Sequence, residues 1–258
     1  MEKRKSLHRT MKSNKQQDII YGIRAVLEAI SEGKTLNKVL VQQGAKGELF
    51  TALMDALKKE KILYQRVPVQ KLNHMVKKNH QGVIAMISPL PYHQIDFLIQ
   101  QIYEKGQDPF VLVLDRVKDV RNFGAICRTA ECMGVNAIVI PAKESALITS
   151  DAIKTSAGAL YKVPVCKVHH LSSAVEFLMG SGLKIYAISE KAQKSINQYK
   201  YNGPKALIMG SEEDGINQQL LKLSNEVYKV PMKGTIDSLN VSVATAIALY
   251  EMSRDTNA

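Results

Sequence analysis

Polar residues gather in three blocks of this sequence, each placed where an apolar run gives way to a turn or a helix. The blocks are Asn122–Ala130 (Asn-Phe-Gly-Ala-Ile-Cys-Arg-Thr-Ala), Gly210–Gly215 (Gly-Ser-Glu-Glu-Asp-Gly) and Ser238–Asn240 (Ser-Leu-Asn). In an open α/β sheet, the carboxyl ends of neighbouring strands form the crevice in which ligands bind. The three blocks therefore predict a single polar pocket at one edge of a sheet.

The first block argues against a dinucleotide-binding site. Such a site carries Gly-x-Gly-x-x-Gly after its first strand, whereas the turn after Asp115 contains only Gly124. Asn122, near a helix start, and Arg128, further along the helix, are candidates for facing a ligand. The alternative is that Asn122 caps the helix and Arg128 is a surface or ion-pairing residue.

The second and third blocks also have structural alternatives. Gly210 directly follows an apolar strand, where the lack of a side chain lets a ligand approach the backbone. Glu213 and Asp214 suit an ordinary turn before a helix, whose dipole favours acidic residues. Ser238 or Asn240 could serve simply as the cap of the helix that follows.

No metal site is expected. Cys127, Cys132 and Cys166 are odd in number and lack a close pair, which indicates packing residues in a reducing compartment. His169-His170 has no acidic or cysteine partner at ligand spacing, so we expect an exposed loop there. His80-Gln81-Gly82 is typical of a turn before a strand.

The elements that must position these blocks fall into two domains. Residues 18–90 predict a small α/β domain, residues 91–107 a partly helical connection, and residues 108–258 a regular alternation of strands and helices. Short apolar strands alternating with helices predict a mostly parallel sheet covered on both faces. The helix expected over 241–253 is apolar or small on all sides, so it should be buried in the domain or against a partner subunit.

The charge of the chain points to an anionic partner. Lys and Arg number 35 against 24 Asp and Glu, a net charge of +11, and residues 1–17 form a basic arm with a single acidic residue. This excess favours nucleic acid over a membrane surface, although a merely solubilising arm is the alternative. No apolar run is long enough to span a bilayer or serve as a signal core, so we expect a cytoplasmic protein.

The three blocks resemble the signature motifs of the SpoU, or TrmH, family of RNA 2′-O-ribose methyltransferases in the SPOUT superfamily. The matching segments are Asn122-x-Gly124-x-x-x-Arg128-Thr129-Ala130, Gly210-x-Glu212-x-x-Gly215, and Pro231 with Ser238-Leu239-Asn240-Val241-Ser242. Order and spacing agree with the family, and a small domain also precedes the catalytic domain in bacterial 23S rRNA guanosine 2′-O-methyltransferases of the RlmB type. The resemblance thus covers essentially the whole chain. Glu213-Asp214 departs from it, because many members have a glycine after the glutamate.

The resemblance implies a fold and a cofactor. The fold is a Rossmann-like parallel sheet with a C-terminal trefoil knot, preceded by an L30e-like domain that binds the RNA substrate. S-adenosyl-L-methionine would lie in the knot, held by Gly210, Val230 and Leu239. The family also dimerises through its catalytic domain, so a homodimer is expected.

The resemblance also implies an activity, the methylation of a ribose 2′-hydroxyl in structured RNA, foremost a guanosine of 23S rRNA. Arg128 would be the central catalytic residue, oriented with its substrate by Asn122, Glu212, Ser238 and Asn240. A guanidinium stays protonated, so binding phosphate and stabilising the developing alkoxide suit Arg128 better than general-base chemistry. The alternatives are a tRNA 2′-O-methyltransferase and a non-catalytic RNA-binding ribosome-assembly factor, against which the intact polar set argues.

Overall fold

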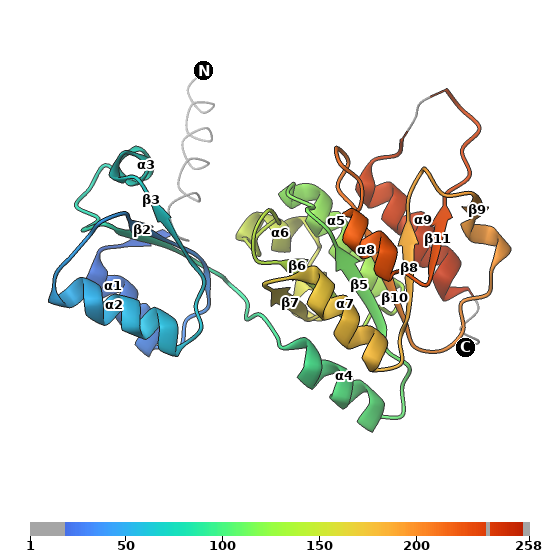
Figure 1. The fold of residues 1–258 in the computed structure, drawn as a ribbon, viewed down its shortest axis with the longest axis horizontal. Coiled ribbons are helices and arrows are strands. Elements are labelled where there is room, and N and C mark those ends of the chain that lie inside the picture. The colour runs from blue at the N-terminus through green and yellow to red at the C-terminus, as the bar shows by residue number, and fades with distance from the viewer. Residues whose placement is uncertain (1–18, 236–237, 255–258) are drawn as a thin grey trace, which may run out of the picture. The chain divides into compact units, whose positions relative to one another are not determined.

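The computed structural model describes residues 19–235 and 238–254, and the chain forms two compact units that divide between Leu90 and Pro91 (Figure 1). The basic arm expected over residues 1–17 lies outside the described residues. Within the described part, no helix has both the length and the apolar character needed to cross a membrane.

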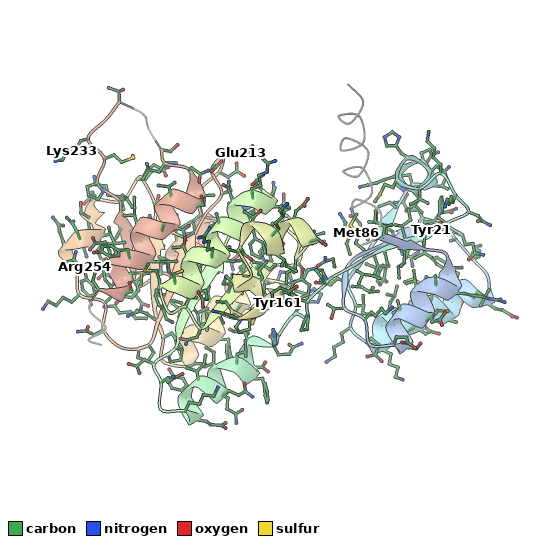
Figure 2. The ribbon with its side chains drawn as sticks, turned by 180° about the vertical axis from the view of Figure 1, so that it is seen from behind. Tyr21, Met86, Tyr161, Glu213, Lys233 and Arg254 are labelled. Atoms are coloured by element: carbon green, nitrogen blue, oxygen red, sulfur yellow. The ribbon has the colours of Figure 1, made fainter. Side chains whose placement is uncertain are left out.

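The first unit is a four-stranded mixed sheet with helices on both faces. Its strands are β1 (Ile19–Tyr21), β2 (Leu36–Gln42), β3 (Tyr64–Val67) and β4 (Val83–Ile87), in the order β1-β4-β2-β3. β4 runs antiparallel to β1 and β2, and Tyr21 and Met86 mark these neighbouring strands in Figure 2. Helices α1 (Ile23–Ser31) and α2 (Glu48–Lys59) bury an apolar stripe on one face, and α3 (Val69–Met75) covers the other.

The turn before β4 is closed by His80 and Gln81. The buried His80 accepts a hydrogen bond at Nδ1 from the Gly82 N–H, which leaves Nε2–H to donate to Asn73 Oδ1 at 2.8 Å. Gln81 Oε1 accepts from the Ile23 N–H at the start of α1. The contacts of this turn are therefore structural.

The second unit is built on a seven-stranded sheet in the order β7-β6-β5-β10-β8-β11-β9, with every neighbouring pair parallel. The predicted parallel α/β fold is confirmed. Its strands are β5 (Phe110–Leu114), β6 (Ala137–Pro141), β7 (Val165–Val168), β8 (Lys184–Ile188), β9 (Lys194–Ser195), β10 (Lys205–Met209) and β11 (Glu226–Lys229). Its helices are α4 (Ile95–Glu104), α5 (Val120–Cys132), α6 (Ser150–Thr155), α7 (Leu171–Gly180), α8 (Gln218–Leu223) and α9 (Val241–Ser253), with 3₁₀ turns η1 (Ala159–Tyr161) and η2 (Ile196–Gln198).

Helices cover both faces of this sheet. Val111 and Val113 of β5 pack with residues of α4, α7 and α8, so the intervening Leu112 faces the opposite side, where α5 and α9 lie (Figure 1). Within the segment 91–107, expected as a connection, α4 places Ile99 and Ile102 in the core of the second unit.

Strand order explains where a ligand can enter. From β5 the chain passes to β6 and β7 on one side and then crosses to β8 on the other, and β10 inserts between β5 and β8. The carboxyl ends of β8, β10 and β11 therefore meet beside that of β5, at the point where the winding direction changes. The trefoil knot stays a prediction that follows from the resemblance.

Cysteine placement differs from expectation at one position. Cys127 and Cys166 are buried, and burial raises the pKa of the Cys166 thiol to about 12. Cys132 is exposed at the end of α5, so its expected role as a packing residue is wrong. The reason is that the last turn of α5 presents this position to solvent.

Candidate functional site

The turn after β10 is closed by its own backbone. Ser211 and Gly215 exchange two N–H to C=O hydrogen bonds, at 3.2 and 3.1 Å. A Cβ on Gly210 would lie 2.2 Å from the carbonyl carbon of Gly215. The turn itself thus requires a glycine here, so a larger residue at position 210 would distort the turn before it could obstruct a ligand.

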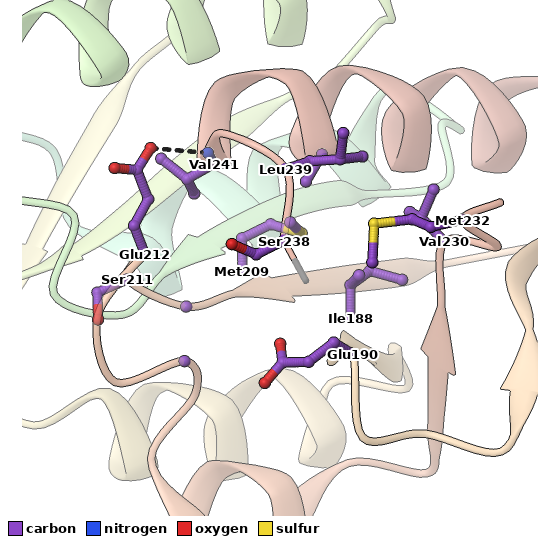
Figure 3. A pocket seen from close by; sticks show the side chains of 13 residues that line it. Ile188, Glu190, Met209, Ser211, Glu212, Val230, Met232, Ser238, Leu239 and Val241 are labelled. Carbon is purple, nitrogen blue, oxygen red and sulfur yellow. Dashed lines mark hydrogen bonds between the residues drawn. The ribbon is translucent and has the colours of Figure 1, made fainter. Parts of the chain in front are cut away.

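Glu212 joins the three polar blocks. Its Oε1 accepts hydrogen bonds from Asn240 Nδ2 at 2.6 Å, from the Val241 N–H at 3.0 Å and from Asn122 Nδ2 at 3.2 Å. Asn240 Nδ2 also donates to Asn122 Oδ1 at 3.1 Å. Figure 3 shows the Glu212 carboxylate directed at the first turn of α9. The structure therefore brings Asn122, Glu212 and Asn240 into one cluster, although 118 residues separate the two asparagines along the chain.

The capping alternatives turn out differently for the two asparagines. Asp119 caps α5 by accepting from the Arg121 and Asn122 N–H groups, so the Asn122 side chain is available to Glu212. Asn240 does cap α9, through the Ser242 N–H, while its amide group bonds to the cluster. Glu212 adds a carboxylate at the same helix N-terminus, which the helix dipole favours.

A cavity of about 90 Å³ lies beside this cluster at the ends of β8, β10 and β11 (Figure 3). Gly210, Glu212, Val230, Ser238 and Leu239, all singled out from the sequence, line it. The lining also includes residues to which the sequence assigned no role in the site: Ile188, Glu190, Met209, Ser211, Gly215, Met232, Val241 and Ala244. The signal for Ile188, Glu190 and Met209 was available, because the sequence predicts strands over 184–189 and 206–209, and these residues lie at or directly after the carboxyl ends.

Arg128 stands apart from this cluster. It lies six residues after Asn122 on α5, and at about 100° per residue the two side chains leave the helix roughly 120° apart. Arg128 is exposed, does not line the cavity, and has no hydrogen bond or ion pair among the residues that the structure describes. Its guanidinium is therefore available to a molecule that approaches α5.

Arg116 and Asp115 connect the end of β5 to the turn after β10. Arg116 donates to Asp115, to Asp214 Oδ2 and to the Gly215 carbonyl oxygen. The pKa of Arg116 lies above its ordinary value, first because of the hydrogen bond to Asp115 and then through the nearby carboxylates, against the opposing effect of burial. Glu213, by contrast, is exposed at the surface of the unit (Figure 2).

Replacing Glu212 tests the cluster. We expect Glu212→Ala to lower the free energy of unfolding by about 1–2 kcal/mol, because three donors lose a charged acceptor at a site open to water. Glu212→Gln keeps an acceptor oxygen and should lose less. Urea unfolding of both variants is the measurement, with the exposed Glu213→Ala as matched control. Equal stability of Glu212→Ala and Glu213→Ala would contradict the cluster.

Comparison with known families covers both units. Residues 109–250 match the model of the SpoU rRNA Methylase family, and residues 19–93 match the model described as RNA 2′-O ribose methyltransferase substrate binding. A TrmH family tRNA/rRNA methyltransferase of Bacillus subtilis strain 168 is 33% identical over 245 residues, which covers 95% of this chain and 98% of the relative. A TrmH family tRNA/rRNA methyltransferase of Staphylococcus aureus strain MSSA476 is 34% identical over 239 residues, covering 93% and 96%.

Solved structures share the fold. An AdoMet-bound rRNA methyltransferase from Sinorhizobium meliloti aligns with a TM-score of 0.59 at 20% identity, covering 93% of this chain and 88% of that one. The SpoU methyltransferase AviRb from Streptomyces viridochromogenes, in complex with AdoMet, aligns with a TM-score of 0.58 at 18% identity, covering 92% and 89%.

Proposed function

Because the chain belongs to the SpoU rRNA methylase family and is an RNA 2′-O-ribose methyltransferase, we propose that it methylates the 2′-oxygen of a guanosine in 23S ribosomal RNA. The observation that carries this proposal is the hydrogen-bonded cluster of Asn122, Glu212 and Asn240 beside a cavity at the strand ends. Polar groups from three separate segments thus lie beside this cavity, and one of them, Glu212, lines it.

The residues that line the cavity have the chemistry to hold the methyl donor, S-adenosyl-L-methionine. Val230, Leu239 and Ile188 offer apolar sides to an adenine ring, and Gly210, which has no side chain, lines the cavity with its backbone. The exposed carboxylate of Glu190 at the same cavity complements a positively charged ligand. When bound, this cofactor supplies an electrophilic sulfonium methyl group.

The remaining catalysis is positioning and charge stabilisation by this chain. Arg128 binds an RNA phosphate near the target ribose and stabilises negative charge that develops on the 2′-oxygen. Asn122, Glu212 and Asn240 hold one another and orient the substrate, and Ser238 completes the polar side of the cavity.

The first unit recognises the RNA, and the second forms a homodimer. RNA recognition by the first unit is supported by the match of residues 19–93 to a substrate-binding domain and by the net positive charge of the chain. The homodimer is supported by α9, where the apolar side chains of Val243 and Tyr250 are 47% and 55% exposed. They lie seven residues apart and so share one helix face. A second copy would cover this face.

Mapping the methylated nucleotide tests the proposed function. Total RNA from cells that lack the enzyme is incubated with the protein and methyl-labelled S-adenosylmethionine, and the alkali-resistant linkage is located by sequencing. Label in 23S rRNA at a guanosine supports the proposal. Label confined to tRNA makes the chain a tRNA 2′-O-methyltransferase, and cofactor binding without transfer to any RNA favours an assembly factor.

A further inference from the structure

We infer that Arg116 is a positioning residue, which fixes the turn 210–217 against the end of β5 and thereby sets the place of Glu212 and of one cavity wall. The inference rests on the proposed function only where the cavity is taken as the cofactor site. The connection that Arg116 makes between this turn and the end of β5, here called the tie, follows from hydrogen bonds within this chain.

Arg116 uses its whole guanidinium in this tie. Nε and Nη2 donate to Asp115 Oδ1 and Oδ2, each at 3.1 Å, while Nη1 donates to Asp214 Oδ2 at 3.1 Å and Nη2 also to the Gly215 carbonyl oxygen at 3.2 Å. One side chain thus forms hydrogen bonds both to the end of β5 and to a turn 99 residues further along the chain. A lysine ammonium cannot reproduce the paired bonds to both carboxylate oxygens.

Asp115 stabilises the tie by accepting hydrogen bonds from both Arg116 and the turn. It is 4% exposed, and its Oδ2 also accepts from the Asn217 N–H at 2.7 Å. The same carboxylate therefore holds the turn directly through Asn217 and indirectly through Arg116. Without Arg116, the Asn217 N–H would be the one donor left to the Asp115 carboxylate among the described residues. A buried carboxylate with so few hydrogen bonds destabilises the fold.

The backbone conformation of Arg116 allows a variant that tests its side chain alone. Its φ is 59°, in the left-handed region that residues other than glycine, asparagine and aspartate seldom occupy. A glycine would adopt this conformation without strain. Arg116→Gly therefore removes the guanidinium while favouring the native backbone, which separates the loss of the tie from a loss of the fold.

The turn that Arg116 holds forms part of the cavity wall and carries Glu212. Gly210, Ser211, Glu212 and Gly215 all line the cavity, and Glu212 binds the N-terminus of α9. A turn released from β5 would let Glu212 move away from its donors. Cofactor affinity should therefore fall in Arg116 variants even though Arg116 does not line the cavity.

Two measurements on the full chain test this inference. Without cofactor, hydrogen exchange in peptides spanning 211–217 should be faster in Arg116→Gly and Arg116→Lys than in wild type. Calorimetry should show the Kd for S-adenosylmethionine raised about tenfold in both, the scale of losing a charged hydrogen bond. Lys118→Ala, which breaks only an exposed pair with Glu144, should leave both readouts within about twofold.

A further variant assigns the tie to the correct partner. Asp214 is 59% exposed, so Asp214→Ala should shift the Kd by less than about threefold. A shift as large as that of Arg116→Gly would overturn the assignment to the Asp115 fork. Wild-type exchange and affinity in Arg116→Gly would overturn the inference altogether. Failure of the wild-type chain to bind the cofactor would instead overturn the proposed function, while faster exchange in the variants would still establish the tie.

Discussion

Arg128→Ala should lower kcat for RNA methylation by about a thousandfold and change the Kd for S-adenosylmethionine by less than about threefold. The reason for the split is that Arg128 acts on the RNA phosphate and on charge that forms in the transition state, whereas the ground-state cofactor occupies a cavity that Arg128 does not line. Single-turnover rates on the mapped RNA and calorimetry with the cofactor measure the two quantities.

The environment of Arg128 makes this variant a clean test. Because its side chain is exposed and makes no ion pair or hydrogen bond within the described part of the chain, its removal should leave the melting temperature nearly unchanged. Arg121→Ala is the matched control, since Arg121 is exposed on the same helix and its side chain likewise has no partner among residues 19–235 and 238–254. We expect the control to keep kcat within about threefold.

Arg128→Lys refines the assignment. A lysine keeps the positive charge but loses the forked donors, so partial activity indicates that charge contributes and that phosphate geometry adds to it. Turnover of Arg128→Ala close to wild type would remove Arg128 from the catalytic set. An equal loss of cofactor affinity and turnover would place it at the cofactor instead.

Elements with a strong local pattern could be predicted from the sequence, and those fixed by distant partners could not. The helix predicted over 241–253 is α9, and the apolar run Val83–Ile87, which predicts a strand, is β4. Ile20 shares the helical spacing of Ile23, Val26 and Ile30, which predicts one helix for all four, but Ile20 lies in β1 because Ile19–Tyr21 pairs with β4. Sheet pairing over such a distance leaves no signal in the periodicity of one segment.

The site shows the same division. The rule that strand ends meet was enough to predict that Asn122, Glu212 and Asn240 converge. It could not place Arg128, whose direction depends on α5 beginning at Val120 and so on the Asp119 cap. It also missed Arg116, because the partners Asp214 and Gly215 come from the turn after β10 and the backbone conformation of Arg116 is atypical for its residue type.

Removing the first unit should separate cofactor binding from RNA methylation. A fragment of residues 91–258 should fold and bind S-adenosylmethionine like the full chain, because it keeps the whole second unit, α4 included. A fragment of 108–258 loses the buried Ile99 and Ile102 and should unfold several kcal/mol more easily, at about 1.5–3 kcal/mol for each side chain. Urea unfolding compares the two fragments, and calorimetry follows the cofactor.

The folded fragment 91–258 should still lose RNA methylation by about a hundredfold or more, since the positive unit that matches a substrate-binding domain is gone and fewer phosphate contacts remain. The RNA affinity of the full chain should fall steeply with salt, and less steeply once the basic residues 1–17 are deleted, because fewer counterions are then released on binding. Filter binding of one rRNA fragment across salt concentrations measures these slopes. If 91–258 methylates that RNA as efficiently as the full chain, recognition lies in the second unit, and the charge of the first unit serves another purpose.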